Sequence, residues 1–337
     1  MIRHIPIELY HHPAWIDWQQ TQGWKLLHAG QGYPVFLRHL GAGISMAYAV
    51  PADLACQDGS LVDDAGSALE RLSHRLLPFL PSTCAFIRWD IPAGAWKDSQ
   101  GRAIDPRLQE LRMNASTAMR SLRKAFQEQT CPDTMIVDLR GGEAAVRTRF
   151  DERTRYSVRL AQRRGTSVER AGETGAEEFA SLYNHTAQRH GLQRKTTADF
   201  IGLMRSGEAN GLDIELYLAR SGGEAAAGAI FARYSAASWY LFAASSSALR
   251  AAAGPTAILA SVLCRYAETG VKRMDLLGVA PGGEENHPLA GLSRFKAGFG
   301  GARLSKAGAW DYVIQPPAYA RCAAAALARQ AARAGAQ

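Results

Sequence analysis

The sequence predicts a mixed α/β protein with two domains. At 337 residues the chain exceeds the usual size of one hydrophobic core, and its 47% hydrophobic content is enough to bury two cores. In both halves, apolar runs of strand length alternate with segments whose apolar residues recur at helical spacing. No segment approaches about 18 uninterrupted apolar residues, so we expect nothing that spans a membrane.

The first half is predicted to begin with strands and then to alternate. Strand composition marks 24–28, 33–40 and 44–50, and 41–43 is typical of a hairpin turn between the last two. A helix is expected at 65–80 and a strand at 84–89. A second helix is expected at 114–129, capped by Asn114 or Ser116, before a strand at 135–139.

The second half repeats this alternation at greater length. We expect helices at 142–164 and 177–189, strands at 214–220, 228–234 and 238–243, a helix at 254–268 and a strand at 273–277. This succession resembles the acyltransferase fold of the GCN5 type (GNAT). Its rough echo in the first half suggests two such units in tandem. The alanine-rich residues 323–334 indicate a terminal helix.

Charge and cysteine usage restrict the partners and the compartment. The net charge is +8, and 32 of the 39 basic residues are arginine, which suits phosphate contacts with a nucleic acid or nucleotide sugar. An arginine-rich proteome would give the same bias. The five cysteines show neither paired nor metal-ligand spacing, and the first ten residues lack a signal-peptide run, so a reduced, cytoplasmic protein is expected.

The stretch from Asp275 to Gly301 has the composition of a functional site. It places several glycines and the pair Phe295-Lys296 between two strand-like runs. Glycine permits positive φ and close approach of the backbone to a ligand, while Phe295 and Phe299 give an apolar floor on which a lysine would be partly desolvated. The alternative is an ordinary glycine-rich turn whose Lys296 is solvated.

Three ordered motifs make the chain similar to the Fem family of peptidyltransferases. They are Asp275-Leu-Leu-Gly278 with His287-Pro-Leu-Ala-Gly-Leu292 and Phe295-Lys-Ala-Gly-Phe-Gly-Gly301; Thr134-Met-Ile-Val-Asp-Leu139 followed by an arginine-rich helix; and Ala237-Ser-Trp-Tyr-Leu-Phe-Ala-Ala-Ser245. The resemblance implies two tandem GNAT-like domains with a cleft between them, at 1–140 and 141–312. It also implies a C-terminal helix over 313–337, which we expect to pack back on the first domain. The interval 168–214 is too short for the coiled-coil arm of some members.

The same resemblance implies a reaction. Fem enzymes use aminoacyl-tRNA to add an amino acid to the stem peptide of a peptidoglycan precursor, either UDP-MurNAc-pentapeptide or its lipid-linked form. Lys296 would stabilise the oxyanion of the tetrahedral intermediate, and Phe295 would shape the pocket. No metal and no organic cofactor are expected, and the protein is expected to be a monomer.

Other residues receive roles with open alternatives. Tyr240, Ser245, Arg189 and Tyr183 are candidates for binding the precursor, with Arg189 and Tyr240 expected to meet at one diphosphate; a packed tyrosine and a surface arginine are the alternatives. Asp90 is a candidate to accept the amine proton, and the alternative is that it caps a turn. A tRNA backbone track is predicted at Arg155, Arg159 and Arg163, with further basic residues at Arg112, Arg120, Arg123 and Lys124; the alternative is a solvated helix face.

Two other functions stay open. One is an acyltransferase with another activated donor, such as coenzyme A. Its pyrophosphate loop would fall at 248–256, but Arg250 and Gly254 are one residue too far apart, and Pro255 lacks a backbone donor. The other is a noncatalytic module that binds tRNA or a nucleotide sugar.

Overall fold

The computed structural model describes residues 8–27, 32–51, 54, 60–96, 104–282, 284 and 286–334, which fall into two compact units. Unit 1 comprises the described residues of Met1–His11, Gln22–Pro132 and Ser305–Gln337, and unit 2 comprises His12–Thr21 and Asp133–Leu304. The change of unit at 132/133 lies close to the predicted boundary at 140/141. Two segments depart from the predicted division, because 12–21 belongs to unit 2 and 305–312 to unit 1.

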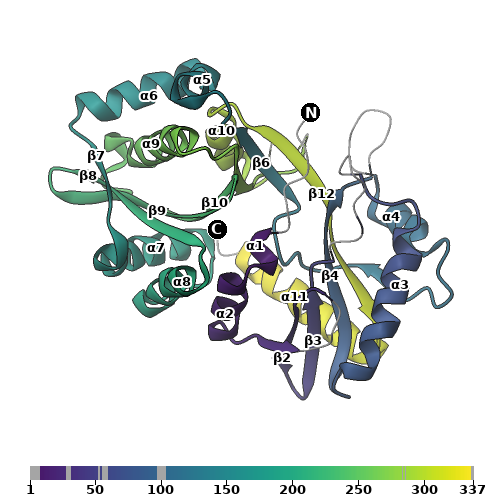
Figure 1. The fold of residues 1–337 in the computed structure, drawn as a ribbon. Helices are drawn as coiled ribbons and strands as arrows, with labels where there is room; N and C mark the ends of the chain where they lie inside the picture. The colour runs from purple at the N-terminus through teal and green to yellow at the C-terminus, as the bar shows by residue number, and fades with distance from the viewer. Residues whose placement is uncertain are drawn as a thin grey trace. The chain divides into compact units, whose positions relative to one another are not determined.

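Unit 1 is built on a mostly antiparallel sheet (Figure 1). Its strands are β1 (Lys25–Leu27), β2 (Val35–Gly41), β3 (Ile44–Ala49), β4 (Cys84–Gly94), β5 (Leu122–Lys124) and most of β12 (Ala302–Val313). The order is β1-β2-β3-β4-β12, and β5 pairs with the other edge of β12. Only β3 and β4 are parallel, and the helix between them in the chain makes that crossover.

The described part of unit 1 also contains the helices α1 (Glu8–His11), α3 (Ala65–Leu76, continued by the 3-10 turn Leu77–Phe79), α4 (Pro106–Asn114) and α11 (Pro316–Ala334). Helix α3 buries Leu69, Leu72 and Leu76, which share one helix face, in a core that also holds Trp89 and Trp310. On α11, the Tyr319 ring packs edge-on against Phe86 of β4.

The prediction of a helix at 114–129 is wrong, because the helix in this region, α4, ends at Asn114. Asp105 caps α4 by accepting a hydrogen bond from Arg107 N (2.8 Å), and Pro106 occupies the first turn, so the helix begins earlier. Asn114 ends the helix rather than starting it. Its amide donates to Leu122 O (2.8 Å) and accepts from Leu122 N (3.3 Å), which closes the loop 115–121 and leads the chain into β5.

In unit 2 the strands follow the order β6-β11-β10-β9-β8-β7. Its strands are β6 (Asp133–Asp138), β7 (Ser167–Arg170), β8 (Asp213–Ser221), β9 (Glu224–Tyr234), β10 (Ala237–Ser245) and β11 (Arg273–Gly278). All neighbours are antiparallel except β10 and β11, which α9 (Gly254–Glu268) connects as a parallel crossover.

Helices cover both faces of this sheet (Figure 1). One face carries α5 (Gly142–Arg149), α6 (Glu152–Arg163) and α9; the other carries α2 (Pro13–Thr21), α7 (Ala176–His190) and α8 (Thr197–Asn210). Short 3-10 turns lie at Gly172–Gly175 and Arg250–Ala252, and α10 (Ala290–Ala297) follows β11. None of the helices among the described residues combines the length and apolar character needed to cross a bilayer.

Two further sequence predictions are corrected in unit 2. The single helix expected at 142–164 is two helices, because Phe150 is extended and Asp151 accepts a hydrogen bond from Thr154 N (2.6 Å) as the cap of α6. Helix α8 was not predicted, although Thr196 and Asp199 form a capping box at its start. Helix α2 was also missed; its Trp18 is buried in unit 2 and donates to Asp199 O (3.1 Å).

Candidate active site

The end of β11 is distorted at the predicted site. The pairing of β11 with β6 shifts register between Asp275 and Gly278, and between them Leu277 takes φ = +57°. The Asp275 carboxylate supports this turn by accepting a hydrogen bond from Leu277 N (2.7 Å). A leucine in the left-handed region costs on the order of 1–3 kcal/mol, and such strained residues and bulges cluster at functional sites.

Lys296 meets this bulge from α10. Its side chain is only 4% exposed, and Nζ donates a hydrogen bond to Gly278 O at 2.7 Å. The solvated alternative for Lys296 is therefore wrong. An ammonium donates up to three hydrogen bonds, and the carbonyl at the bulge takes one of them and fixes the position of the charge.

The segment that carries Lys296 is a short helix rather than an open loop. Ser293 ties it to the preceding segment, because its hydroxyl accepts from Ala280 N (2.7 Å) and donates to Leu289 O (2.8 Å). The Phe299 ring packs edge-on against both Phe295 and Phe150. Phe295 therefore adjoins the core of unit 2 immediately beside the lysine.

Two glycines of this stretch, Gly298 and Gly300, serve close backbone packing. Among those at 278, 291, 298, 300 and 301, only Gly300 has positive φ. A Cβ on Gly298 would lie 2.3 Å from Thr154 Oγ1, and one on Gly300 would lie 2.6 Å from Arg149 O. The expected use of these glycines to admit a ligand is thus wrong for those two positions, where the backbone approaches the junction of α5 and α6.

Thr134 is a residue of this region that sequence reasoning did not select as a site residue. It lies opposite Gly278 in the ladder between β6 and β11 and is fully buried. Its Oγ1 has no hydrogen-bond partner among the described residues. A buried hydroxyl without a partner is uncommon in native structures, so it marks a position of interest next to the bulge.

Arg189 and Ser245 are brought together. The Arg189 guanidinium, at the end of α7, donates to Ser245 O (2.9 Å) and Thr186 Oγ1 (3.1 Å) through Nη2. Thr186 Oγ1 in turn accepts from Ser245 N (3.3 Å). The arginine is exposed, so a positive group is held at the end of β10.

Tyr240 does not join them, and the predicted meeting of Arg189 and Tyr240 at one diphosphate is wrong. Tyr240 lies on the sheet face covered by α9, where its ring stacks on Phe231 with centroids 5.1 Å apart, and burial raises its pKa. Arg189 belongs to α7, which covers the other face. A bulge between Tyr240 and Phe242 breaks the strand alternation and turns Phe242 to the α7 face.

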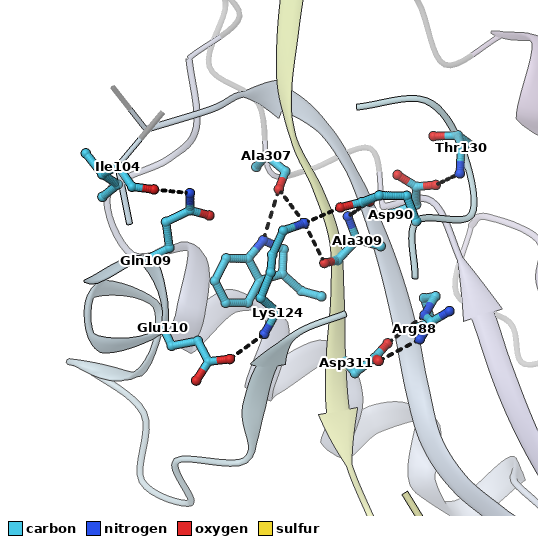
Figure 2. Close-up of polar contacts among 12 residues, drawn as sticks. Arg88, Asp90, Ile104, Gln109, Glu110, Lys124, Thr130, Ala307, Ala309 and Asp311 are labelled. Atoms are coloured by element: carbon cyan, nitrogen blue, oxygen red, sulfur yellow. Dashed lines mark hydrogen bonds and ion pairs between the residues drawn. The ribbon is translucent and has the colours of Figure 1, made fainter. Parts of the chain in front are cut away.

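Tyr183 and Asp90 are both buried. Tyr183 packs edge-on against Phe200 and Phe242 on the α7 face, and burial raises its pKa. Asp90 lies within β4 of unit 1, where Oδ2 accepts a hydrogen bond from Thr130 N (3.0 Å) (Figure 2). It also accepts one from Tyr48 OH (3.3 Å). Asp90 is paired with Ala309 inside the sheet, so the turn-capping alternative is wrong.

A buried ion pair lies close to Asp90 in unit 1 (Figure 2). Arg88 of β4 makes two hydrogen bonds to the Asp311 carboxylate of β12, at 2.8 and 2.7 Å. Tyr319 of α11 also donates to Asp311 (3.1 Å), and the Arg88 guanidinium lies over the Phe126 ring, 4.5 Å from its centroid. This bidentate pair connects the two central strands and the C-terminal helix.

The predicted tRNA-binding arginines share one exposed face of α6. Arg155, Arg159 and Arg163 recur at four-residue spacing, and none of them makes an ion pair within the described part of the chain. Tyr156 is exposed on the same face, and the Arg163 guanidinium lies 5.7 Å from its ring centroid.

No three His, Cys, Asp or Glu side chains among the described residues are grouped so as to hold a metal ion.

Comparison with known proteins places this geometry in a class. Residues 148–296, which end at Lys296, match the acetyltransferase (GNAT) domain family. A crystal structure of FemX superimposes with a TM-score of 0.68 and 18% identity over 96% of this chain and 100% of that one. L-PGS from Bacillus licheniformis gives a TM-score of 0.50 at 10% identity, covering 89% of this chain and 88% of that one. The protein is therefore a mixed α/β protein with GNAT-like domains.

Part of the chain is also similar in sequence to known transferases. A lipid II:glycine glycyltransferase of Staphylococcus saprophyticus is 33% identical over 103 residues, and one of Staphylococcus haemolyticus is 32% identical over the same length. Each match covers 29% of this chain, and it spans only 25% and 24% of those two relatives. These similarities support the resemblance to the Fem family that the motifs of the sequence carry.

Proposed function

We propose that this protein is an aminoacyltransferase that moves an amino acid from aminoacyl-tRNA to the stem-peptide amine of a peptidoglycan precursor. The observation that carries the proposal is the buried Lys296 ammonium, fixed on the Gly278 carbonyl at a strained bulge. The names of the curated relatives, lipid II:glycine glycyltransferases, support the acceptor class and make glycine the first amino acid to test.

The chemistry assigns Lys296 its role. The acceptor amine attacks the ester carbonyl of the aminoacyl-tRNA, a C–N bond forms, and negative charge develops on the carbonyl oxygen. An ammonium already desolvated and held in place stabilises that oxyanion far more than one in water does. Collapse of the intermediate breaks the ester C–O bond and releases the ribose oxygen, which needs a proton.

The fate of the amine proton distinguishes two routes. It passes either to Asp90 or directly to the leaving ribose oxygen, for which no protein base is needed. Asp90→Asn preserves the acceptor oxygen for Thr130 N but removes the base. A large loss of turnover in this variant supports the first route, and near wild-type turnover supports the second.

The loop before α9 favours a donor other than coenzyme A. In GNAT acetyltransferases such a loop offers its backbone donors to a pyrophosphate. Here Ala252 N and Ala253 N donate to Leu249 O and Arg250 O, and Pro255 has no N–H to offer. Thr166 Oγ1 further ties the loop by donating to Ala252 O (2.8 Å).

The α6 face supports an RNA donor. Three arginines at four-residue spacing suit a phosphate backbone, and the exposed Tyr156 between them offers a ring on which an unpaired base can stack. For the acceptor, we propose that Arg189, anchored by Thr186 and Ser245, contacts the precursor's diphosphate, and that Tyr183 and Tyr240 act through packing.

One transfer assay tests the proposal. The purified protein is incubated with a mixed pool of charged tRNA and, in separate reactions, with UDP-MurNAc-pentapeptide or its lipid-linked form, and the product mass is read. We expect a mass increase of one or more amino acid residues that disappears after ribonuclease treatment and in Lys296→Met. Product formation from acetyl-coenzyme A, with charged tRNA inert, would assign the other donor class.

A further inference from the structure

Helix α4 of unit 1 presents an apolar and basic surface that the transfer chemistry does not use. Its inner side is committed to the fold: Met113 is buried, Gln109 donates to Ile104 O (2.8 Å), and Glu110 accepts from Lys124 N (2.9 Å) (Figure 2). The outer side carries Leu108 and Leu111, which are 43% and 68% exposed. Residues three apart share one helix face, so the two leucines lie side by side.

The loop after α4 adds to this surface. Asn114 holds both ends of the loop 115–121 through its two hydrogen bonds to Leu122, so the loop begins and ends at the last turn of the helix. Glu70 of α3 fixes it further by accepting from Ala118 N (2.9 Å) and Met119 N (2.8 Å). Met119 is nevertheless 62% exposed, because its backbone rather than its side chain is held.

The same helix and loop also carry basic side chains: helical spacing places Arg107 and Arg112 beside the two leucines, and Arg120 lies in the loop. Arg107, Arg112, Arg120 and Arg123 are all exposed, and none of them makes an ion pair with another described residue. The Arg123 guanidinium donates to Arg120 O (3.0 Å) and so remains at the loop. The acids Asp105, Glu110 and Glu70 accept hydrogen bonds from backbone N–H groups: Asp105 caps α4, Glu110 binds Lys124 N, and Glu70 binds Ala118 N and Met119 N.

We propose that this α4 surface, defined by Leu108, Leu111, Met119, Arg107, Arg112, Arg120 and Arg123, attaches the protein to an anionic phospholipid membrane. Exposed aliphatic side chains together with cations that make no ion pair match a bilayer interface, where the apolar groups enter the acyl boundary and the cations meet phosphate headgroups. An RNA surface would instead present aromatic rings for base stacking, as α6 does and α4 does not. The proposal requires neither an aminoacyl donor nor an acceptor.

Vesicle binding tests the attachment directly. The full-length protein is floated with vesicles of phosphatidylcholine alone, or of phosphatidylglycerol and phosphatidylcholine in equal parts, at low and high salt. We expect binding to the anionic vesicles that weakens as salt rises. Leu108→Gln with Leu111→Gln should lower the partition coefficient about tenfold or more. Arg112→Gln with Arg120→Gln should lower binding to the anionic vesicles by roughly fivefold per arginine.

A matched control separates this surface from other exposed leucines and arginines. Leu327→Gln with Arg329→Gln alters α11, where Leu327 is 58% exposed in the same unit, and should bind vesicles like the wild type. All substituted side chains are exposed, so unchanged melting temperatures are expected. The proposal is overturned if the wild type does not float, if only the α11 variant loses binding, or if the α4 variants lose affinity for tRNA but not for vesicles. A failed transfer assay leaves it intact.

Discussion

Three residues around the end of β11 lower the stability of the folded state, and favourable interactions elsewhere in unit 2 must offset this. Leu277 adopts a left-handed conformation, Lys296 buries a charge, and Thr134 buries a hydroxyl without a partner among the described residues. Each of these lowers the stability of the folded state by on the order of a kcal/mol or more. Such features together are typical of functional sites, which agrees with the role we propose for Lys296.

Replacing Lys296 by Met keeps the aliphatic stem and removes the charge. Because the oxyanion would lose its nearest cation, we expect turnover in the transfer assay to fall about a hundredfold or more. Lys272→Met is the control, since Lys272 is exposed in the same unit. Equal turnover of both variants would remove Lys296 from the catalytic machinery.

Thr134→Val exchanges the buried hydroxyl for a methyl group of similar size. The free energy of unfolding should rise by about 1 kcal/mol, because an unpaired polar group leaves the interior. We expect turnover to fall nevertheless, since a costly hydroxyl beside Gly278 is retained for a contact with the reacting groups. Thr134→Ser retains the hydroxyl and should keep turnover. A stabilised Val variant with full turnover would show that the hydroxyl has no such contact.

At the scale of elements, sequence patterns identified most strands and misjudged helix ends. The hairpin at Gly41–Gly43 and the strand–helix–strand order around α9 followed from local composition and are present. Helix α4 was displaced in the prediction because Asn114 suits a cap, whereas its amide binds Leu122 across the loop. Tertiary hydrogen bonds of this kind cannot be predicted from the spacing of apolar and capping residues in the sequence.

At the candidate site, too, tertiary contacts could not be predicted from the sequence. The motif residues led to Lys296, and its burial bears out the expectation that it would be desolvated. The partner carbonyl of Gly278 and the register shift at Asp275 were not predictable, because they depend on how β11 pairs with β6. The expected meeting of Arg189 and Tyr240 failed for a similar reason, since one bulge in β10 decides which face each side chain enters.

Two helical glycines give opposite predictions for one substitution. A Cβ on Gly66 of α3 would lie 1.6 Å from Met113 O, so the backbones of α3 and α4 would have to separate. Gly66→Ala should lower the free energy of unfolding by about 3 kcal/mol. Gly202 of α8 has no atom within 4 Å of the added Cβ, and Gly202→Ala should raise it by about 1 kcal/mol. Denaturant titration of both variants measures this, and equal effects would contradict the close crossing at Gly66.

At the scale of the molecule, the net charge of +8 predicts a strong dependence of RNA binding on salt. The logarithm of the tRNA affinity should fall linearly with the logarithm of the salt concentration. Replacing Arg155, Arg159 and Arg163 together by Gln should reduce the magnitude of that slope by about 2 to 3. Each phosphate contact that forms releases about one counterion, and the variant forms up to three fewer contacts. Arg321→Gln, an exposed change on α11, is the control. An unchanged slope in the triple variant would exclude the α6 face from tRNA binding.

The course of the chain also dictates when each unit can fold during synthesis. The central strand of unit 1, β12, lies between β4 and β5, yet it is translated after nearly all of unit 2. Until then β4 has an open edge, and Arg88 is a cation whose carboxylate partner, Asp311, does not yet exist. A nascent chain that ends before residue 300 therefore exposes the unpaired edge of β4 to chaperones and proteases. We expect a fragment of residues 1–140 to aggregate, and adding a separate peptide of residues 302–334 to restore its solubility. A fragment that is folded and monomeric without the peptide would contradict this order of assembly.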